Sequence, residues 1–205
     1  MNTKKSAGIA LFLTALIVFS PLAGFAQTAT SYSGEGTALK LTAPAGISLV
    51  AGDTGALPSS GGNLSTSALS VNVLGLASAD ALKSTASGSG TTSQATSQAA
   101  HVSLLGGVIA ADVVKSNTSA TCSGSTASTS GTAQIVNLVV AGQSVAVSNP
   151  NLSLTLPAGI SVVVNQQTSS SSGANSGSIT VNALHVTGPA GLDIVVASSQ
   201  SDITC

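Results

Sequence analysis

The chain has 205 residues, of which 5% are charged and 2% aromatic, and it contains no tryptophan. Aromatic anchors, arginine forks and nucleophile–base pairs account for much of protein binding and catalysis. A chain so poor in these residue types is not expected to be an enzyme.

The N-terminal segment has the features of a secretory signal peptide, which we place at residues 1–26. Lys4 and Lys5 precede an apolar run over residues 7–19, and small residues favour cleavage after Ala26. The alternative is an uncleaved membrane anchor. It is less favoured, because the run is shorter than the roughly 20 residues that a membrane-spanning helix needs. We expect the mature protein, residues 27–205, to be secreted or extracellular in a bacterium and to have no membrane span.

The mature chain is mildly acidic, with three lysines, six carboxylates and a net charge of −3. It has no basic cluster to hold phosphate groups, so we expect no nucleic-acid partner. All three phenylalanines lie in the predicted signal peptide, which leaves Tyr32 as the aromatic residue of the mature chain. The charged residues are Lys40, Lys83, Lys115, Glu35, Asp53, Asp80, Asp112, Asp193 and Asp202.

Apolar and small polar residues alternate in many short stretches, which predicts strands. We therefore predict an all-β fold, an antiparallel β-sandwich formed by a single domain over residues 27–205, with an irregular β-solenoid as the alternative. A turn of helix is compatible with the pattern at Ala77–Ser84. The clearest strands are residues 69–73, 135–140, 152–156, 160–164 and 179–183.

Apart from Asn175, three segments consist of Ser, Thr, Gly, Ala and Gln: residues 87–98, 123–132 and 168–177. Such composition suits a flexible linker, but β-branched threonine also suits an exposed strand face. We expect these segments to be long, mobile hairpin tips.

Two pairs of similar blocks predict an internal duplication, around residues 39–76 and 152–186. Residues 41–50 resemble residues 154–163, and residues 70–74 resemble residues 180–184, in the same order. A third echo links the segments around Asp80, Asp112 and Asp193.

Each copy of the first block contains Pro-Ala-Gly. Pro44 and Pro157 cannot donate to a strand ladder, and Gly46 and Gly159 permit a positive φ, so each triplet predicts a hairpin turn. Residues 141–143 predict another hairpin.

Two cysteines, Cys122 and Cys205, each end an alternating stretch. In an exported chain they are expected to form one disulfide. Free thiols or a metal site are the alternative, although two cysteines without nearby histidines fall short of a zinc site.

The C-terminal two thirds of the chain resemble the choice-of-anchor P family of bacterial exported proteins. The resemblance covers most of residues 64–205, with Val136-Asn-Leu-Val-Val-Ala-Gly-Gln, Leu154-Thr-Leu-Pro-Ala-Gly-Ile-Ser-Val-Val-Val-Asn-Gln-Gln, Val181-Asn-Ala-Leu-His-Val and Leu192-Asp-Ile-Val-Val-Ala-Ser-Ser as its motifs. It implies an exported surface or secreted protein with no assigned catalytic residue. The chain stops at Cys205 without an anchoring motif, which favours secretion over surface attachment, and Gln166 replaces an expected glutamate, which argues against a cation site.

Few residues are candidates for chemistry. His101 and His185 can join Asp112 or Asp193 at a metal, but two histidines are below the usual ligand number, and a hydrogen-bonded structural role is favoured. Asp80, Asp112 and Asp193 can hold calcium if they meet in space, but aspartates that cap turns are commoner. We therefore predict no catalytic, cofactor or metal residues.

These observations favour a non-enzymatic structural or interaction protein with an envelope or extracellular partner. One alternative is a binding module for a polysaccharide or an ice lattice, built on threonine rows of a flat sheet. A hydrolase or metalloenzyme that uses His101, His185 and the aspartates is the least favoured.

Overall fold

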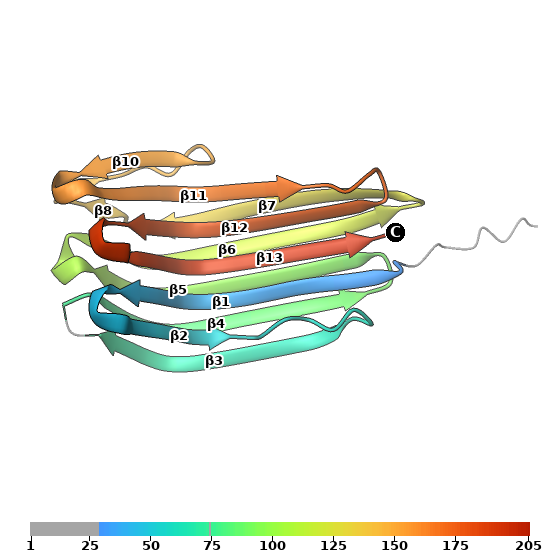
Figure 1. Cartoon of the computed structure of the whole chain (residues 1–205), viewed down its shortest axis with the longest axis horizontal. Coiled ribbons are helices and arrows are strands. Elements are labelled where there is room, and N and C mark those ends of the chain that lie inside the picture. Colours follow the sequence, from blue (N-terminus) through green and yellow to red (C-terminus); the bar gives the residue numbers. More distant parts are fainter. Residues whose placement is uncertain (1–28, 74) are drawn as a thin grey trace, which may run out of the picture.

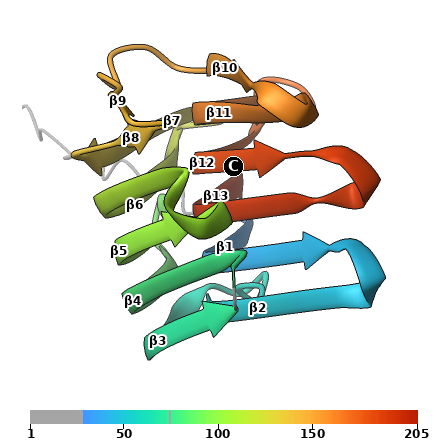
Figure 2. The ribbon, with the colours of Figure 1, turned by 90° about the vertical axis from the view of Figure 1, so that its left-hand side faces the viewer.

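The computed structural model describes residues 29–73 and 75–205, and the predicted signal peptide therefore lies outside the described residues. The described chain forms two antiparallel sheets that pack face to face, as Figures 1 and 2 show. The predicted β-sandwich is confirmed, and the solenoid alternative is wrong.

The six-stranded sheet has the order β10-β11-β12-β13-β1-β2, so the first and last parts of the described chain lie side by side in it (Figure 1). Every neighbouring pair is antiparallel. Its strands are β1 (Ser31–Ala43), β2 (Ile47–Asp53), β10 (Leu152–Leu156), β11 (Ile160–Ser170), β12 (Ser176–Thr187) and β13 (Asp193–Thr204).

The seven-stranded sheet has the order β3-β4-β5-β6-β8-β9, and β7 pairs with β6 beside β8. Figure 2 shows this sheet as the second layer, seen from the end where the Pro-Ala-Gly turns lie. Its strands are β3 (Gly62–Val73), β4 (Ala77–Ser89), β5 (Thr92–Leu104), β6 (Ile109–Ser123), β7 (Thr126–Val136), β8 (Val139–Val140) and β9 (Gln143–Ser144).

The Pro-Ala-Gly triplets turn hairpins as predicted. Pro44–Gly46 joins β1 to β2, and Pro157–Gly159 joins β10 to β11. The alanine and the glycine of each triplet both have positive φ, the conformation of the tight hairpin turn that matches strand twist. A third triplet, Pro189–Gly191, joins β12 to β13 in the same way and was not singled out from the sequence. The predicted hairpin at residues 141–143 joins the short strands β8 and β9.

Two local predictions are wrong. Ala77–Ser84 lies in β4, not in a turn of helix. The three polar segments are not long tips, because most of their residues are paired in strands and the hairpins end in short turns. Those turns are residues 90–91, 124–125 and 171–175.

The repeated blocks occupy different structural contexts. Residues 41–50 and 154–163 both form a strand, a Pro-Ala-Gly turn and a second strand. However, Ser70–Val73 belongs to β3 of the seven-stranded sheet, whereas Thr180–Leu184 belongs to β12 of the six-stranded sheet. The similar hairpins are therefore followed by different arrangements of strands.

In both sheets, side chains point alternately to the core and to the outside along each strand. This alternation is interrupted where a row of residues with positive φ crosses the strands, which we call the transverse row. In β13, Ile194 and Val196 face the core before Ala197, and Ser199 and Ser201 face it after Ala197. Ala197 has a φ of 52°, and Gly52 and Asn165 in the same sheet also have positive φ. A non-glycine residue in this conformation costs about 1–2 kcal/mol, so surrounding contacts must hold the row in place. In the seven-stranded sheet the row includes Ala81, His101 and Asn137.

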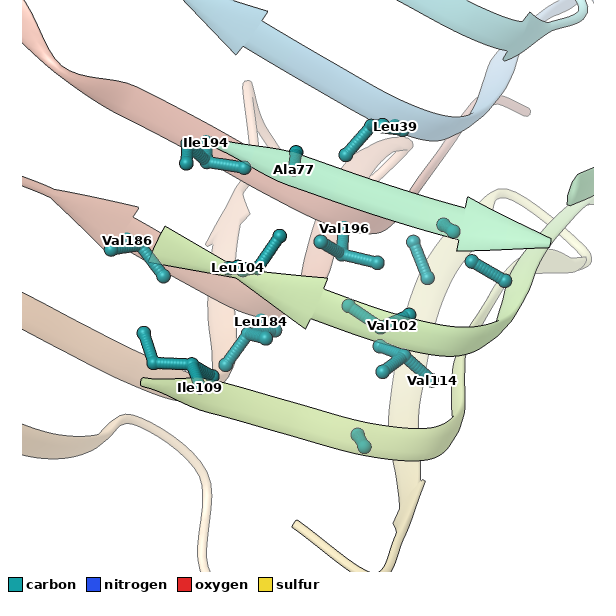
Figure 3. Packing of buried hydrophobic residues seen from close by; sticks show 14 of the residues in the cluster. Leu39, Ala77, Val102, Leu104, Ile109, Val114, Leu184, Val186, Ile194 and Val196 are labelled. Atoms are coloured by element: carbon teal, nitrogen blue, oxygen red, sulfur yellow. The ribbon is translucent and has the colours of Figure 1, made fainter. Parts of the chain in front are cut away.

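The core is apolar at the end that carries the Pro-Ala-Gly turns, where leucine, valine and isoleucine from both sheets interdigitate (Figure 3). Beyond the transverse rows the interior becomes polar and narrow. Ser84 and Ser97 share a hydrogen bond of 2.8 Å, and Thr118 bonds Ser201 of the opposite sheet, also at 2.8 Å. A Cβ on Gly36 would lie 2.8 Å from the Thr96 carbonyl oxygen, so the sheets approach too closely there for a larger residue.

A second, small apolar cluster lies at the far end of the sandwich and contains the cysteines. Cys122 and Cys205 form the predicted disulfide, with Cα atoms 5.6 Å apart. Cys122 belongs to β6 and Cys205 follows β13, so the bond joins the two sheets rather than two neighbouring strands of one sheet.

Candidate functional site

The two histidines lie on different sheets and do not share a site. His101 is on β5 and contacts Asp80 of β4, with Nδ1 and Oδ2 3.5 Å apart. Both side chains are exposed, at 75% and 56%, so the pair is solvated and weak. His185 is on β12 of the other sheet. Within residues 29–73 and 75–205, no group of three His, Cys, Asp or Glu side chains has the placement of a metal site.

The three echoed aspartates are also separated. Asp112 accepts a hydrogen bond of 2.6 Å from Nδ2 of Asn137, a residue not singled out from the sequence. Asp80 and Asp112 lie on β4 and β6 of the seven-stranded sheet, with β5 between them, whereas Asp193 begins β13 of the other sheet. The three aspartates therefore do not form one site.

His185 takes part in a polar network on the outward face of the six-stranded sheet. Asn182 donates from Nδ2 to Oε1 of Gln166 at 2.8 Å, and Ser198 donates to Oδ1 of Asn182 at 2.7 Å. Oε1 of Gln166 is thus an acceptor, so Nδ1 of His185, 2.8 Å away, carries the hydrogen. Nε2 of His185 lies 3.3 Å from Oδ1 of Asp193 without hydrogen-bond geometry.

In this network Gln166 serves as a neutral hydrogen-bond acceptor. An amide can accept from His185 and Asn182 together without adding charge. The network spans β11, β12 and β13, three neighbouring strands whose registers place these residues in adjacent rows. The signal in the sequence is the set of amides at outward positions of strands, but their proximity depends on the pairing register.

A shallow depression of about 260 Å³ adjoins the network. It is lined by one acid, one amine, two amides, two hydroxyls and a valine, so it brings several kinds of polar group together. A larger hollow, about 410 Å³, is lined by Ser, Thr, Ala and Gly alone. The depression is formed by Glu35, Thr37, Lys40, Asn182, Val195, Ser198 and Gln200.

Glu35 is the perturbed acid of this depression. Partial burial raises the pKa of Glu35, and the negative charge of Asp53 and a hydrogen bond with it raise that pKa further. Lys40 and Thr37 act in the opposite direction. Asp53 is itself held in place, because its Oδ1 accepts from Thr37 at 3.2 Å and from the Gly55 amide at 3.0 Å.

The outward face of the seven-stranded sheet carries ordered rows of small polar residues. Cross-strand pairing links Ser65 to Thr85, Thr85 to Thr96, Thr96 to Asn117 and Asn117 to Thr132. The Thr85 and Thr96 hydroxyls lie 2.8 Å apart and share a hydrogen bond. Neighbouring strands are about 4.8 Å apart, so the row presents hydroxyl and amide groups at a regular spacing.

Tyr32 is not available for stacking on a ligand. Its side chain is buried at the disulfide end of the core, and its hydroxyl donates to the Gly90 carbonyl at 2.6 Å. The ring is therefore part of the packing that supports the disulfide.

Comparisons with known proteins find no matching family model, no matching curated protein and no matching solved structure. Among the described residues, no helix has the length and apolar character needed to cross a membrane.

Proposed function

We propose that this chain is a non-enzymatic structural or interaction protein of a bacterial surface or secretome, which contacts its surroundings through two polar sheet faces. The observation that carries the proposal is the alignment of Ser, Thr, Asn and Gln into cross-strand rows. One row crosses five strands, from Ser65 to Thr132. A row of this kind presents hydroxyl and amide groups in a line across the sheet.

Short polar side chains suit such a surface. Serine and threonine lose little rotamer freedom when a partner immobilises them, and each hydroxyl both donates and accepts a hydrogen bond. On the six-stranded sheet, the network of Gln166, Asn182, His185 and Ser198 fixes the side chains before any partner arrives. Such preorganisation reduces the entropy cost of binding.

The disulfide, rather than the two sheets, supports the proposal that the protein is exported. Disulfides persist mainly in oxidising compartments, and the bond between Cys122 and Cys205 fits that setting. The signal-peptide prediction for residues 1–26 and the resemblance to the choice-of-anchor P family support the same proposal.

Cell fractionation with chemical crosslinking tests this proposal. The full chain is expressed in a bacterium beside a matched control that lacks residues 2–26. We expect the full chain in the culture medium or at the cell surface, beginning at Gln27, and the control inside the cell. Recovery of the full chain in the cytoplasm with residues 1–26 intact would contradict export, and a catalytic turnover by the purified mature protein would contradict the non-enzymatic role.

The threonine row also favours a second candidate, binding to a polysaccharide or an ice lattice. Regular spacing allows several hydroxyls to meet a repeating surface at once, which multiplies weak contacts. The buried ring of Tyr32 makes sugar stacking unavailable, so the lattice must be met by hydrogen bonds. Ice recrystallisation and insoluble-polysaccharide pulldown assays test this candidate. Thr96→Lys should abolish either activity, whereas Thr180→Lys on the opposite sheet should retain it.

A further inference from the structure

One long sheet edge has no partner in the described chain. β3 pairs with β4 on one side, and none of the described residues pairs with its other side. The strand has 12 residues, none charged and none proline. Proteins normally protect exposed edges with charges, prolines or short strands, because an edge presents free N–H and C=O groups to other chains.

The remaining edges are shorter or better covered. Nε2 of Gln167 donates to the Gly131 carbonyl of β7 at 3.2 Å, and Ala127 of β7 donates to Ala174 at 2.8 Å. β10 has five residues and β9 has two. β2 ends in the charged Asp53. The edge of β3 is thus the longest unguarded one in residues 29–73 and 75–205.

An exposed leucine marks the middle of this edge. The side chain of Leu69 is 92% exposed, the highest value among the large apolar residues of the described chain. It lines a hollow of about 280 Å³ beside β4, with Ala68, Ala81 and Leu82 among its neighbours. A partner that covers this leucine would remove its apolar surface from water, which favours association.

The face pattern of β3 matches itself when a second copy runs antiparallel. Ser65, Ser67, Leu69, Ser70 and Asn72 are exposed, whereas Thr66, Ala68 and Val71 are half-buried, so the alternation reverses between Leu69 and Ser70. If Ser67 pairs with Ser70 of a second copy, Ser65 pairs with Asn72, so these exposed polar residues meet each other, and Leu69 of each copy lies opposite Ala68 beside the two-fold axis. The reversal between Leu69 and Ser70 is what makes the strand self-complementary, because a one-residue slip would mismatch both halves.

The charges beside β3 also fit this register. Lys83 pairs with Ser67, and Asp80 pairs with Ser70, on the neighbouring strand β4. When Ser67 meets Ser70 of a second copy, the row that begins at Lys83 of one copy ends at Asp80 of the other. Lys83 of one copy and Asp80 of the other are three strand spacings apart, about 14 Å, so their attraction favours this orientation only at low ionic strength.

We propose that β3 is a self-association edge, at which two copies of this chain pair antiparallel and join their seven-stranded sheets. The pairing satisfies the free backbone groups of β3 and buries both copies of Leu69 near the two-fold axis. The inference deepens the proposed structural role and rests on it only for biological meaning, since self-association can be measured on purified protein whether or not the chain is exported.

Sedimentation equilibrium of purified residues 27–205, with the disulfide intact, tests the proposal over a range of protein concentrations. We expect a monomer–dimer equilibrium. Leu69→Lys places like charges at the axis and should raise the dimer dissociation constant by about tenfold or more. The matched control Val136→Lys, an exposed position on β7, should leave it within about twofold.

A crosslinking experiment tests the register. A Ser67→Cys chain is mixed with a Ser70→Cys chain and oxidised, and a mixed disulfide should form in preference to either homodimer. Circular dichroism confirms that each variant is folded. A protein that stays monomeric at every concentration would overturn the proposal, even if its β3 edge bound a different protein. Equal weakening of the dimer by Leu69→Lys and Val136→Lys would also overturn it. So would crosslinking that gives mainly Ser67→Cys or Ser70→Cys homodimers.

Discussion

Replacing Cys122 and Cys205 by alanine is expected to destabilise the fold by several kcal/mol. The disulfide spans 83 residues and joins β6 of one sheet to the end of β13 in the other. It therefore restricts a large part of the unfolded chain while adding little constraint to strands that already face each other.

The chain-entropy model gives the magnitude. Releasing a loop of 83 residues adds unfolded-state entropy worth about 4.5 kcal/mol at 25 °C. Both cysteines are 8% exposed and pack in the small cluster with Tyr32, Ala120 and Ile203. Alanine keeps part of this apolar packing, so the entropy of the loop dominates the expected loss.

Guanidinium denaturation followed by circular dichroism measures the effect. The oxidised protein, the reduced protein and the Cys122→Ala/Cys205→Ala variant are compared. The reduced protein and the variant should unfold at similar, lower midpoints, with a steeper denaturant dependence because an uncrosslinked chain exposes more surface. Reductant should not change the variant, which has no thiol. Equal midpoints for the oxidised and reduced proteins would refute the reasoning.

Three further predictions concern the interior and the acidic depression. Gly36→Ala pushes a methyl group against the facing sheet and should lower the free energy of unfolding by about 1–3 kcal/mol. Denaturant titration measures this loss, and an unchanged unfolding midpoint would show that the sheets can separate there. Thr118→Val leaves the Ser201 hydroxyl buried without its partner and should cost about 1–3 kcal/mol, and adding Ser201→Ala should recover part of it in a double-mutant cycle; strict additivity would contradict the cross-sheet bond. Because the pKa of Glu35 is raised above its ordinary value of 4.5, the fold is favoured below pH 4.5 and loses this contribution as pH rises through the folded-state pKa. Glu35→Gln should therefore raise the melting temperature at pH 7 and have little effect below pH 4.5, and Asp53→Asn should lower the pKa of Glu35 in an NMR titration; the same effect of Glu35→Gln at both pH values would contradict this sign.

The local features of the fold could be predicted because their causes are local. Alternation of apolar and polar residues defines strands, and the backbone limits of proline and glycine define turns such as Pro44–Gly46 and Pro157–Gly159. A single pair of cysteines left one possible intramolecular disulfide. These features need no knowledge of which strands become neighbours.

Two predictions from local patterns failed, the turn of helix and the mobile tips, because both patterns depend on contacts made in the tertiary structure. Ala77–Ser84 breaks the strand alternation because Ala81 has a positive φ of 48° in the transverse row, and the break imitated a turn of helix. Serine-rich segments were expected at mobile tips, but Ser97 is buried against Ser84, because the facing sheet is close enough to enclose small side chains.

The sequence by itself determined an all-β chain, its Pro-Ala-Gly hairpins and the pairing of Cys122 with Cys205. Only the tertiary structure decided that His101 and His185 lie on separate sheets and that Gln166 links His185 to Asn182. It also decided that β3 lies at the edge of its sheet, where β4 is its one strand neighbour among the described residues. The reason is physical: alternation fixes which face of a strand is buried, whereas the strand beside it and the register between them depend on contacts between distant parts of the chain.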